Sequence, residues 1–516
     1  MDWFDDWALT LAVFLPIVGA TLVLLIPRAQ EQAIKATALV ASLATLGVGV
    51  GILVDFDYDH AGKLQFQANE SWIEVIKSRY HLGLDGIGLP LLILSMVIVV
   101  ACVIYSWDHF PEPRNAKAFL ALVLLLEVGM NGTFVAQDLI LFFVFFEIVL
   151  LPMFFMILVW GGPNRQYASI KFFLFTLFGS ALMLVGFLAL FFTSKQQTFD
   201  MVELTKLGGV GIGHTTQMLI FGGLFLGFAI KVPMFPFHTW LPDAHTEAPT
   251  VGSVLLAAIL LKLGTYGFVR IALPLLPDAA KEWAPYIGLL AVIGIIYGAL
   301  CCLAQRDMKR LIAFSSVAHM GFVMLGIATL TDFGLNAAIF GMVAHGLITG
   351  MLFFVAGSVQ ERYETREMSR LGGLLAQAPK LGWILGFSAM ASLGLPGLAG
   401  FWGEFPAILS SYNPASSADG LFGISDGTLW TFRTFMVIAA IGTVLAAGYL
   451  LWMLQRVAFG KPAAEFENAH IHDLHVPEWL AWTPLLLLIL ALGVYPNLVF
   501  KMSDGAVQGV ARVFGG

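Results

Sequence analysis

Long apolar runs dominate the chain and are separated by short polar connections. A helix needs about 20 apolar residues to cross the hydrocarbon core of a membrane. The sequence predicts fourteen such spans, at residues 8–27, 33–54, 84–107, 116–134, 139–160, 168–193, 215–238, 250–274, 284–304, 309–330, 335–359, 380–411, 430–456 and 479–500. We therefore expect an all-α polytopic membrane protein with both termini on one side and no water-soluble domain between the spans.

Two spans are interrupted by proline and glycine. Pro233 and Pro236 remove backbone hydrogen-bond donors from the seventh span, and the run SLGLPGLAGFWGEFP interrupts the twelfth. Each is the fourth member of a group of five spans, four to eight and nine to thirteen. Interrupted helices at matching places are typical of inverted-repeat transporters. Because five is an odd number of crossings, the second group starts from the opposite side of the membrane, and its orientation is therefore inverted relative to the first. Ordinary proline kinks are the alternative.

On this prediction the chain divides into four parts. An N-terminal segment of three spans covers residues 1–107, and the first inverted repeat covers 116–274. The second inverted repeat covers 284–456. A loop, the last span and a short tail make up 457–516.

Composition and charge narrow the class of protein and its orientation. Hydrophobic residues make up 59% and charged residues 12%, whereas soluble domains carry about 25% charged residues. This excludes a soluble enzyme, a nucleic-acid-binding protein and a disordered scaffold. Connections after odd-numbered spans hold fifteen Lys and Arg residues against eight on the other side, which places both termini outside the cytoplasm. The sequence starts without a transit peptide, so we expect multi-pass insertion in the inner (plasma) membrane of a bacterial cell.

Six ionisable residues lie deep within the predicted spans. They are Glu147, Lys231, Lys262, His319, His345 and Glu404. A charge near the bilayer centre costs at least about 2.5–3.5 kcal/mol on insertion scales, and such residues usually mark ion or proton pathways. We interpret them as a hydrated, proton-conducting path through the bundle. The structural alternative is that Glu147 and Lys231 form an ion pair that only fixes helix packing.

Further polar residues near this path are candidates for an accessory role. Glu127 lies nearer the end of its span, and two histidines follow Lys231 closely in the sequence. Hydroxyl groups in the tenth and eleventh spans are candidates to hold bridging water. The accessory set is Glu127, His238, His245, Ser315, Ser316 and Thr349.

Other chemistry has little support in the sequence. The chain lacks C-x-x-C, G-x-G-x-x-G and P-loop motifs, so we expect no metal, Fe–S cluster or nucleotide cofactor within it. His319 and His345 lie at similar depth in consecutive spans, which leaves open a pair of axial haem ligands. A passive membrane scaffold also stays open. The segment HIHDLH, with His470, His472, Asp473 and His475, has the residue types of a metal site, but a solvated loop is the simpler interpretation.

The stretch KVPMFPFHTWLPDAHTEAPTVGSVLLAAILLKLGTYG, at residues 231–267, carries a family resemblance. It resembles the signature of the antiporter-like subunits of respiratory complex I, the proton-pumping NADH:quinone oxidoreductase, and of multisubunit cation/proton antiporters. The resemblance extends over essentially the whole chain. Within the family, Glu404 in GFWGEF is similar to the M-type branch, the counterpart of mitochondrial subunit 4, whereas sister branches usually carry lysine there.

The resemblance implies a role for each of the six buried residues. In the family, a fifth-span glutamate pairs with a seventh-span lysine, an eighth-span lysine connects to relay histidines of the tenth and eleventh spans, and a twelfth-span residue exchanges the proton. The corresponding positions are, in order, Glu147, Lys231, Lys262, His319, His345 and Glu404.

The resemblance also implies partners for the chain. NADH, FMN, Fe–S clusters and quinone are expected in partner subunits, and sister antiporter-like subunits are expected on either side. The function implied is proton translocation driven by redox chemistry in those partners. The alternative is a subunit of a multisubunit cation/proton antiporter that works without redox drive.

Overall fold

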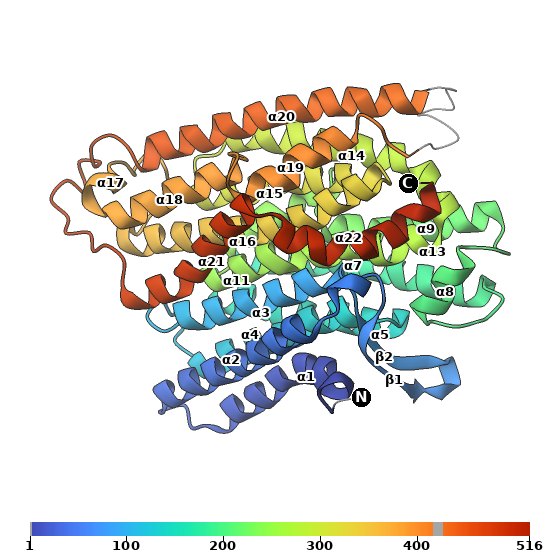
Figure 1. Cartoon of the computed structure of the whole chain (residues 1–516). Coiled ribbons are helices and arrows are strands. Elements are labelled where there is room, and N and C mark those ends of the chain that lie inside the picture. Colours follow the sequence, from blue (N-terminus) through green and yellow to red (C-terminus); the bar gives the residue numbers. More distant parts are fainter. Residues whose placement is uncertain (1–2, 416–426, 516) are drawn as a thin grey trace.

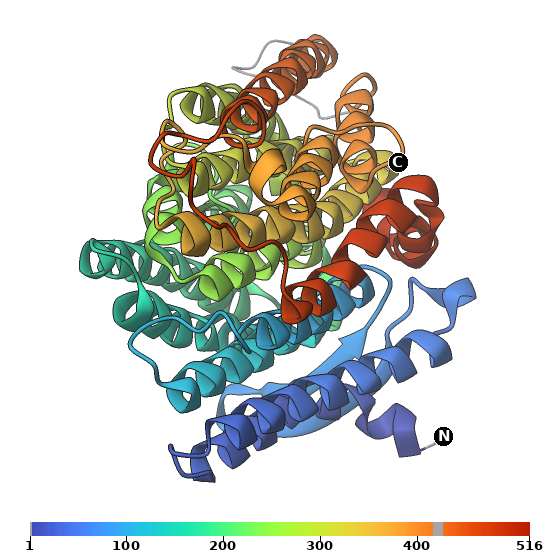
Figure 2. The same ribbon diagram turned by 90° about the vertical axis from the view of Figure 1, so that its left-hand side faces the viewer.

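A computed structural model describes residues 3–415 and 427–515. Its long helices run roughly parallel in one bundle, as Figures 1 and 2 show. Twelve helices of the described residues are long and apolar enough to cross a membrane. They are built from α1 (Trp3–Leu25), α2 (Glu31–Asp55), α3 (Gly88–Tyr105), α4 (Ala116–Val135), α5 (Leu139–Ile148) with α6 (Leu150–Trp160), α7 (Arg165–Thr193), α11 (Thr250–Leu255) with α12 (Leu261–Gly267) and α13 (Leu273–Leu275), α14 (Pro277–Leu303), α15 (Met308–Ala328), α16 (Asp332–Tyr363), α20 (Gly427–Val457) and α21 (Val476–Val494).

The other two predicted spans are broken helices. The seventh consists of α9 (His214–Lys231) and α10 (Trp240–Glu247), and the twelfth of α18 (Pro379–Ser392) and α19 (Ala399–Ser410). The seventh therefore ends at Glu247 rather than at 238, because the chain resumes a helix after its prolines. Within that break the Trp240 indole donates a hydrogen bond of 2.9 Å to the Ile230 carbonyl, which has left the helical ladder. The count of fourteen crossings and the inverted repeats stay predictions.

The connections hold more structure than the sequence predicts. Residues 55–83, expected as a loop, contain an antiparallel hairpin of β1 (Gln65–Ile73) and β2 (Ser78–Leu84), in which Asn69 faces His81. Two short helices, α8 (Met201–Leu207) and α17 (Leu374–Gln377), occupy other connections. Part of the predicted connection 412–429 lies outside the described residues.

Two span boundaries differ clearly from the prediction. The ninth span begins at Pro277 rather than at 284, since proline is well suited to the first position of a helix. The last long helix ends at Val494 rather than at 500, because Pro496 interrupts it. The chain then forms a separate helix, α22 (Asn497–Ala511), on the surface of the bundle against α3 and α16.

The central helix of the bundle is α16. Its membrane-length segment is buried throughout. The helix starts at the N-cap Thr331, whose hydroxyl accepts a hydrogen bond from the Gly334 amide at 3.0 Å. A helix that is apolar on all sides belongs in the core of a large bundle, so any polar side chain on α16 lies among other helices.

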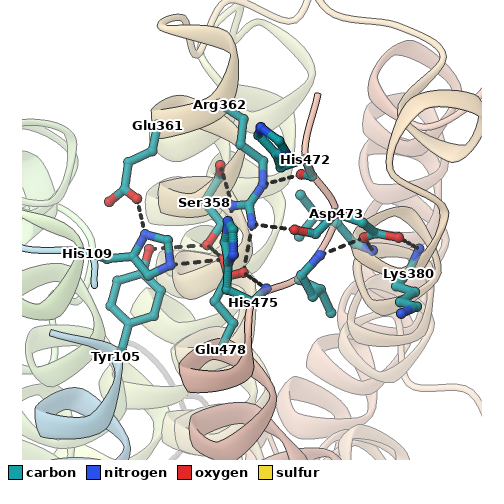
Figure 3. A network of polar contacts seen from close by, with 12 residues as sticks. Tyr105, His109, Ser358, Glu361, Arg362, Lys380, His472, Asp473, His475 and Glu478 are labelled. Atoms are coloured by element: carbon teal, nitrogen blue, oxygen red, sulfur yellow. Dashed lines mark hydrogen bonds and ion pairs between the residues drawn. The ribbon is translucent and has the colours of Figure 1, made fainter. Parts of the chain in front are cut away.

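A buried polar network fixes the end of α16 to the last long helix, as Figure 3 shows. Glu478, in the first turn of α21, has no solvent exposure. Its carboxylate accepts hydrogen bonds from the Arg362 guanidinium at 2.6 and 2.9 Å and from the Ser358 hydroxyl at 2.6 Å. His109, from the connection after α3, lies between Glu478 and Glu361 and contacts both carboxylates. The network joins three segments that are far apart in the sequence.

His109 gives this network a pH dependence. Burial alone would lower the pKa of His109, but hydrogen bonds to Glu361 and Glu478 outweigh burial and raise the pKa to about 9. This is above the ordinary value of about 6.5. The charged imidazole therefore stabilises the fold fully below pH of about 6.5, and this contribution is lost as the pH rises through about 9. At about 1.4 kcal/mol per pKa unit, the whole contribution is about 3 kcal/mol.

We expect the thermal stability of the purified protein to fall as the pH rises from neutral through about 9. The variant His109→Gln should be less stable at neutral pH and should lose most of that slope. A thermal-shift assay across the pH range measures both effects. His470→Gln, which changes an exposed histidine, is the control and should keep the slope. A slope unchanged in His109→Gln would contradict the assignment.

Candidate functional site

Lys262 lies at the centre of the described bundle between two π-helical turns. These turns, Leu256–Leu260 and Phe268–Ala272, flank α12 on either side, and such turns are frequent at functional sites. The lysine side chain is completely buried. Its Nζ donates to the Ala257 carbonyl at 2.6 Å and lies 2.6 Å from Nδ1 of His345. In the tautomer with Nδ1 unprotonated, the His345 ring can therefore accept a proton from the lysine.

His319 and Glu404 form the second contact of the predicted path. Nδ1 of His319, on α15, lies 2.5 Å from Oε1 of Glu404, on α19. The other ring nitrogen, Nε2, meets the Tyr449 hydroxyl at 3.0 Å and the Ser392 hydroxyl at 3.2 Å. All of these side chains are buried. The histidine is thus held with one nitrogen on a carboxylate and the other on two hydroxyl groups.

A small cavity separates the two histidines. The ring centroids of His319 and His345 are 6.0 Å apart, and the cavity between them measures about 20 Å³ and is also lined by Glu404, Ser392 and Thr349. Nε2 of His345 has no hydrogen-bond partner in the described residues. A cavity of this volume, bordered by several polar side chains, has room for a single water molecule. Four of the six predicted residues therefore form two hydrogen-bonded pairs on either side of this cavity.

Two glycines allow this arrangement. Gly341 lies one turn before His345 on α16, and Gly403 precedes Glu404 on α19. A Cβ atom added to Gly403 would lie 2.6 Å from the Gly341 Cα, which is closer than atoms can approach. The absence of side chains lets the two backbones meet and brings the carboxylate toward the histidines.

Glu147 and Lys231 do not form a direct ion pair. Lys231 is the buried last residue of α9, and its Nζ lies 4.6 Å from the centroid of the Phe146 ring, a cation–π arrangement. The half-buried Glu147 interacts with the Ser180 hydroxyl of α7 and, at longer range, with the charge of Lys231. The two side chains attract each other without touching.

No direct contact joins Lys231 to Lys262 among the described residues. Their helices, α9 and α12, nevertheless pack tightly at Gly264. A Cβ atom on Gly264 would lie 2.8 Å from the Phe228 carbonyl and 3.1 Å from Cβ of Lys231. The six predicted residues thus fall into two groups, Glu147 with Lys231 and the four from Lys262 to Glu404, on helices in close contact.

Comparison of the chain with known proteins shows the family to which it belongs. The family model described as NADH:quinone oxidoreductase/Mrp antiporter, TM matches residues 136–424, more than half of the chain. The chain is 38% identical to NADH-quinone oxidoreductase subunit M of Rickettsia prowazekii (strain Madrid E), over 98% of this chain and 99% of the relative. It is 40% identical to the subunit of the same name from Rhodobacter capsulatus, over 98% of this chain and 96% of that protein. The chain belongs to this family of membrane subunits.

Solved structures agree with the family assignment. A chain of respiratory complex I from Thermus thermophilus with bound NADH superposes with a TM-score of 0.86 at 29% identity, covering 98% of this chain and 100% of that one. A chain of the Mrp complex from Dietzia sp. DQ12-45-1b shares the fold, with a TM-score of 0.83 at 19% identity, covering 99% and 98%. These results confirm the resemblance seen in residues 231–267 and the predicted helical membrane fold.

The accessory candidates of this family member occupy different places. Thr349 lines the cavity between the histidines. The hydroxyls of Ser315 and Ser316 are buried and donate to the Ile312 carbonyl, at 2.7 and 3.4 Å. Glu127 on α4 is fully buried, and neither of its carboxylate oxygens has a hydrogen-bond partner in the described part of the chain. Of these residues, only Thr349 directly borders the path.

The two signature histidines also separate. His238, in the break of the seventh span, packs on Phe235 and Tyr297 with ring centroids 5.8 and 5.1 Å away. His245 on α10 is fully buried and stacks on Phe353 at 4.6 Å. The charges of Lys262 and Lys309 both act on the His245 ring. His245 therefore lies within electrostatic reach of both the central lysine of the path and a second lysine.

Lys309 and Tyr449 are polar residues of the site that sequence reasoning missed. From the sequence, Lys309 is one of the basic residues of the connections that indicate the orientation of the chain. In the structure its side chain is buried, and its Nζ donates a hydrogen bond to the Ala248 carbonyl. It lines a cavity of about 240 Å³ with Glu247 and His109. Tyr449 could have been identified from the sequence, because it places a polar hydroxyl group inside an apolar span. For Lys309 no local signal existed, because it begins α15 beside other basic residues.

The two alternative sites find other roles in the structure. The cavity of about 20 Å³ between His319 and His345 is far too small for a haem group. In HIHDLH, the Asp473 carboxylate does not face a metal site within the part of the chain that the structure describes. It accepts hydrogen bonds from the backbone amides of Lys380 and Leu381, at 3.0 and 3.1 Å, and so caps the start of α18. Among the described residues, no group of three or more His, Cys, Asp or Glu side chains is arranged to hold a metal ion.

Proposed function

We propose that the chain is a proton-translocating subunit, of type M, of an NADH:quinone oxidoreductase. The arrangement of Lys262 with His345 and of His319 with Glu404 on either side of one small cavity carries this proposal. Each group has a hydrogen-bond partner next in line, or a cavity for one water molecule between them. The names of the relatives support assignment to this complex.

Proton transfer along these contacts follows their geometry. A charged Lys262 gives a proton to Nδ1 of His345, whose Nε2 releases its own proton to water in the cavity. His319 receives a proton at Nε2 through the Ser392 hydroxyl, which also lines the cavity, and passes one from Nδ1 to Glu404. The imidazoles suit this relay because their ordinary pKa lies near neutral pH.

The pair Glu147 and Lys231 would regulate when this proton transfer starts. Approach of the Glu147 carboxylate stabilises the charge on Lys231, and its withdrawal favours release of the proton toward Lys262. Moving one charge against 100 mV costs about 2.3 kcal/mol. A change of about two pKa units, at about 1.4 kcal/mol each, is sufficient to drive that step.

The energy for transfer comes, on this proposal, from partner subunits. They would hold FMN, Fe–S clusters and the sites for NADH and quinone, and sister antiporter-like subunits would flank this chain on either side. The excess of Lys and Arg in alternate connections supports a bacterial inner membrane topology with both termini outside the cytoplasm.

A tagged chain, purified in mild detergent from its native membrane, tests this function. We expect it to bring down flavin- and iron–sulfur-containing proteins, and the reconstituted complex should couple NADH oxidation by quinone to acidification of the vesicle lumen. Acidification driven by a Na⁺ or K⁺ gradient without NADH would instead identify a cation/proton antiporter subunit. Purification without redox partners and without either activity would refute the proposal.

Removal of the Glu147 carboxylate should uncouple the complex. In Glu147→Ala, Lys231 loses the anion that favours its charged form, so we expect NADH-driven proton pumping to fall at least about tenfold, the effect of one pKa unit. Assembly, judged by subunit content, should not change. Glu203→Ala removes an exposed carboxylate that pairs with Lys206 at 3.0 Å and is the matched control. Normal acidification by Glu147→Ala would show that the pair only fixes packing.

A further inference from the structure

An apolar groove lies on the outer surface of the bundle between α18 and α20, which pack side by side in Figure 1. Its volume is about 810 Å³. The wall is formed by Trp383, Gly386 and Met390 of α18, Gly397 of the break before α19, Leu451 of α20 and Phe459 just after α20, among others. Among the lining residues in the described part of the chain, Gln455 is the polar exception.

The missing side chains of two glycines keep this groove open. A Cβ atom on Gly386 or on Gly397 would have no atom within 4 Å. The large indole of Trp383 on the same wall is 72% exposed. An exposed apolar concavity of this size normally has an occupant.

The length of the groove favours a lipid chain over a protein helix. Helix α18 has 14 residues, a length of about 21 Å at 1.5 Å per residue. The groove follows α18 from its start to the break at Gly397, whereas half of the hydrocarbon core is about 15 Å thick. It therefore spans one leaflet, as an acyl chain does. A transmembrane helix crosses both leaflets and would leave the groove at the break.

The end of the groove near the membrane surface is basic. Lys380 begins α18 two residues before the lining residue Gly382, and Arg456 follows the lining residue Gln455 on α20. Both are exposed. In the described residues the Lys380 ammonium forms no ion pair, although its backbone amide donates to the Asp473 carboxylate at 3.0 Å. The Arg456 guanidinium lies over the Trp452 ring, 4.5 Å from its centroid, and forms no ion pair there either. The nearby Arg370, by contrast, is paired with Glu465 at 2.8 Å.

We propose that this groove binds an anionic phospholipid, with an acyl chain between α18 and α20 and the phosphate at Lys380 and Arg456. The charge of the basic residues complements the phosphate. The acyl chain would cover the break that precedes the helix of Glu404. Gly394, in that break, lies against the Glu404 carboxylate, since an added Cβ would be 3.3 Å from Oε2.

Filling the groove should expel the lipid. Gly386→Leu places a side chain in open space and improves helix propensity, so folding is not at risk. The whole membrane complex is purified, and retained phospholipid is counted by mass spectrometry. We expect one phospholipid fewer per chain in Gly386→Leu. Gly47→Leu, at an exposed glycine of α2 with equally open space, should retain the full number. Equal retention in both variants would overturn the proposal.

A second pair of measurements identifies the occupant and its headgroup. With p-benzoylphenylalanine at position 383, ultraviolet light should attach a phospholipid mass to the chain, and cross-linking to another subunit instead would overturn the proposal. The double variant Lys380→Gln/Arg456→Gln should bind phosphatidylglycerol about 25-fold more weakly, from about fivefold per basic residue, with phosphatidylcholine binding unchanged. An unchanged preference for phosphatidylglycerol would refute the headgroup site.

Discussion

Replacement of Lys262 by methionine is expected to abolish NADH-driven proton pumping while the complex still assembles. Methionine preserves the length and apolar stem of the side chain but cannot carry a proton to Nδ1 of His345, 2.6 Å away. Loss of a positioned proton-transfer group typically costs a factor of at least about a hundred. The measurement is acidification of proteoliposomes containing the purified complex, compared with its subunit content.

Arginine at the same position separates proton transfer from charge alone. Lys262→Arg keeps a positive charge, but a guanidinium does not release its proton in proteins. We therefore expect Lys262→Arg to be as inactive as Lys262→Met. Lys206→Met, which alters an exposed lysine, is the matched control and should pump normally. If Lys262→Arg pumped at the normal rate, the lysine would act only as a fixed charge.

Replacement of Arg362 by methionine is expected to cost about 3–5 kcal/mol of stability, the usual cost of leaving one member of a buried ion pair without its partner. The Arg362 and Glu478 side chains are only 8% and 0% exposed. Without the guanidinium, Glu478 keeps only His109, Ser358 and one backbone amide as partners. We expect a low yield of folded protein and a large fall in the thermal unfolding midpoint.

The double variant Arg362→Met/Glu478→Met tests the physical reason. With both charges removed, no unpaired buried charge remains, and most of the lost stability should return. Arg370→Met is the matched control, because its bridge to Glu465 is exposed and such surface pairs add little to stability. If the double variant were no more stable than Arg362→Met, the loss would lie in packing rather than in charge.

The membrane makes much of this fold predictable from sequence. Apolar runs and their lengths indicate the helices, since backbone groups in lipid must pair within the helix. Pro233 and Pro236 mark the first broken helix for the same reason. The limits of prediction appear where the chain leaves the bilayer. The hairpin of β1 and β2 and the position of the separate helix α22 depend on contacts with other parts of the bundle.

The candidate site divides along similar lines. By itself, the sequence determined which charged residues lie inside the membrane, because a charge there is costly and stands out in an apolar run. The tertiary structure decided which of them touch. It joins Lys262 to His345 and His319 to Glu404, leaves Glu147 and Lys231 apart, and adds Tyr449. Contacts between helices depend on their rotation and on close approaches at glycines, and a pattern along one helix holds no information about its neighbour.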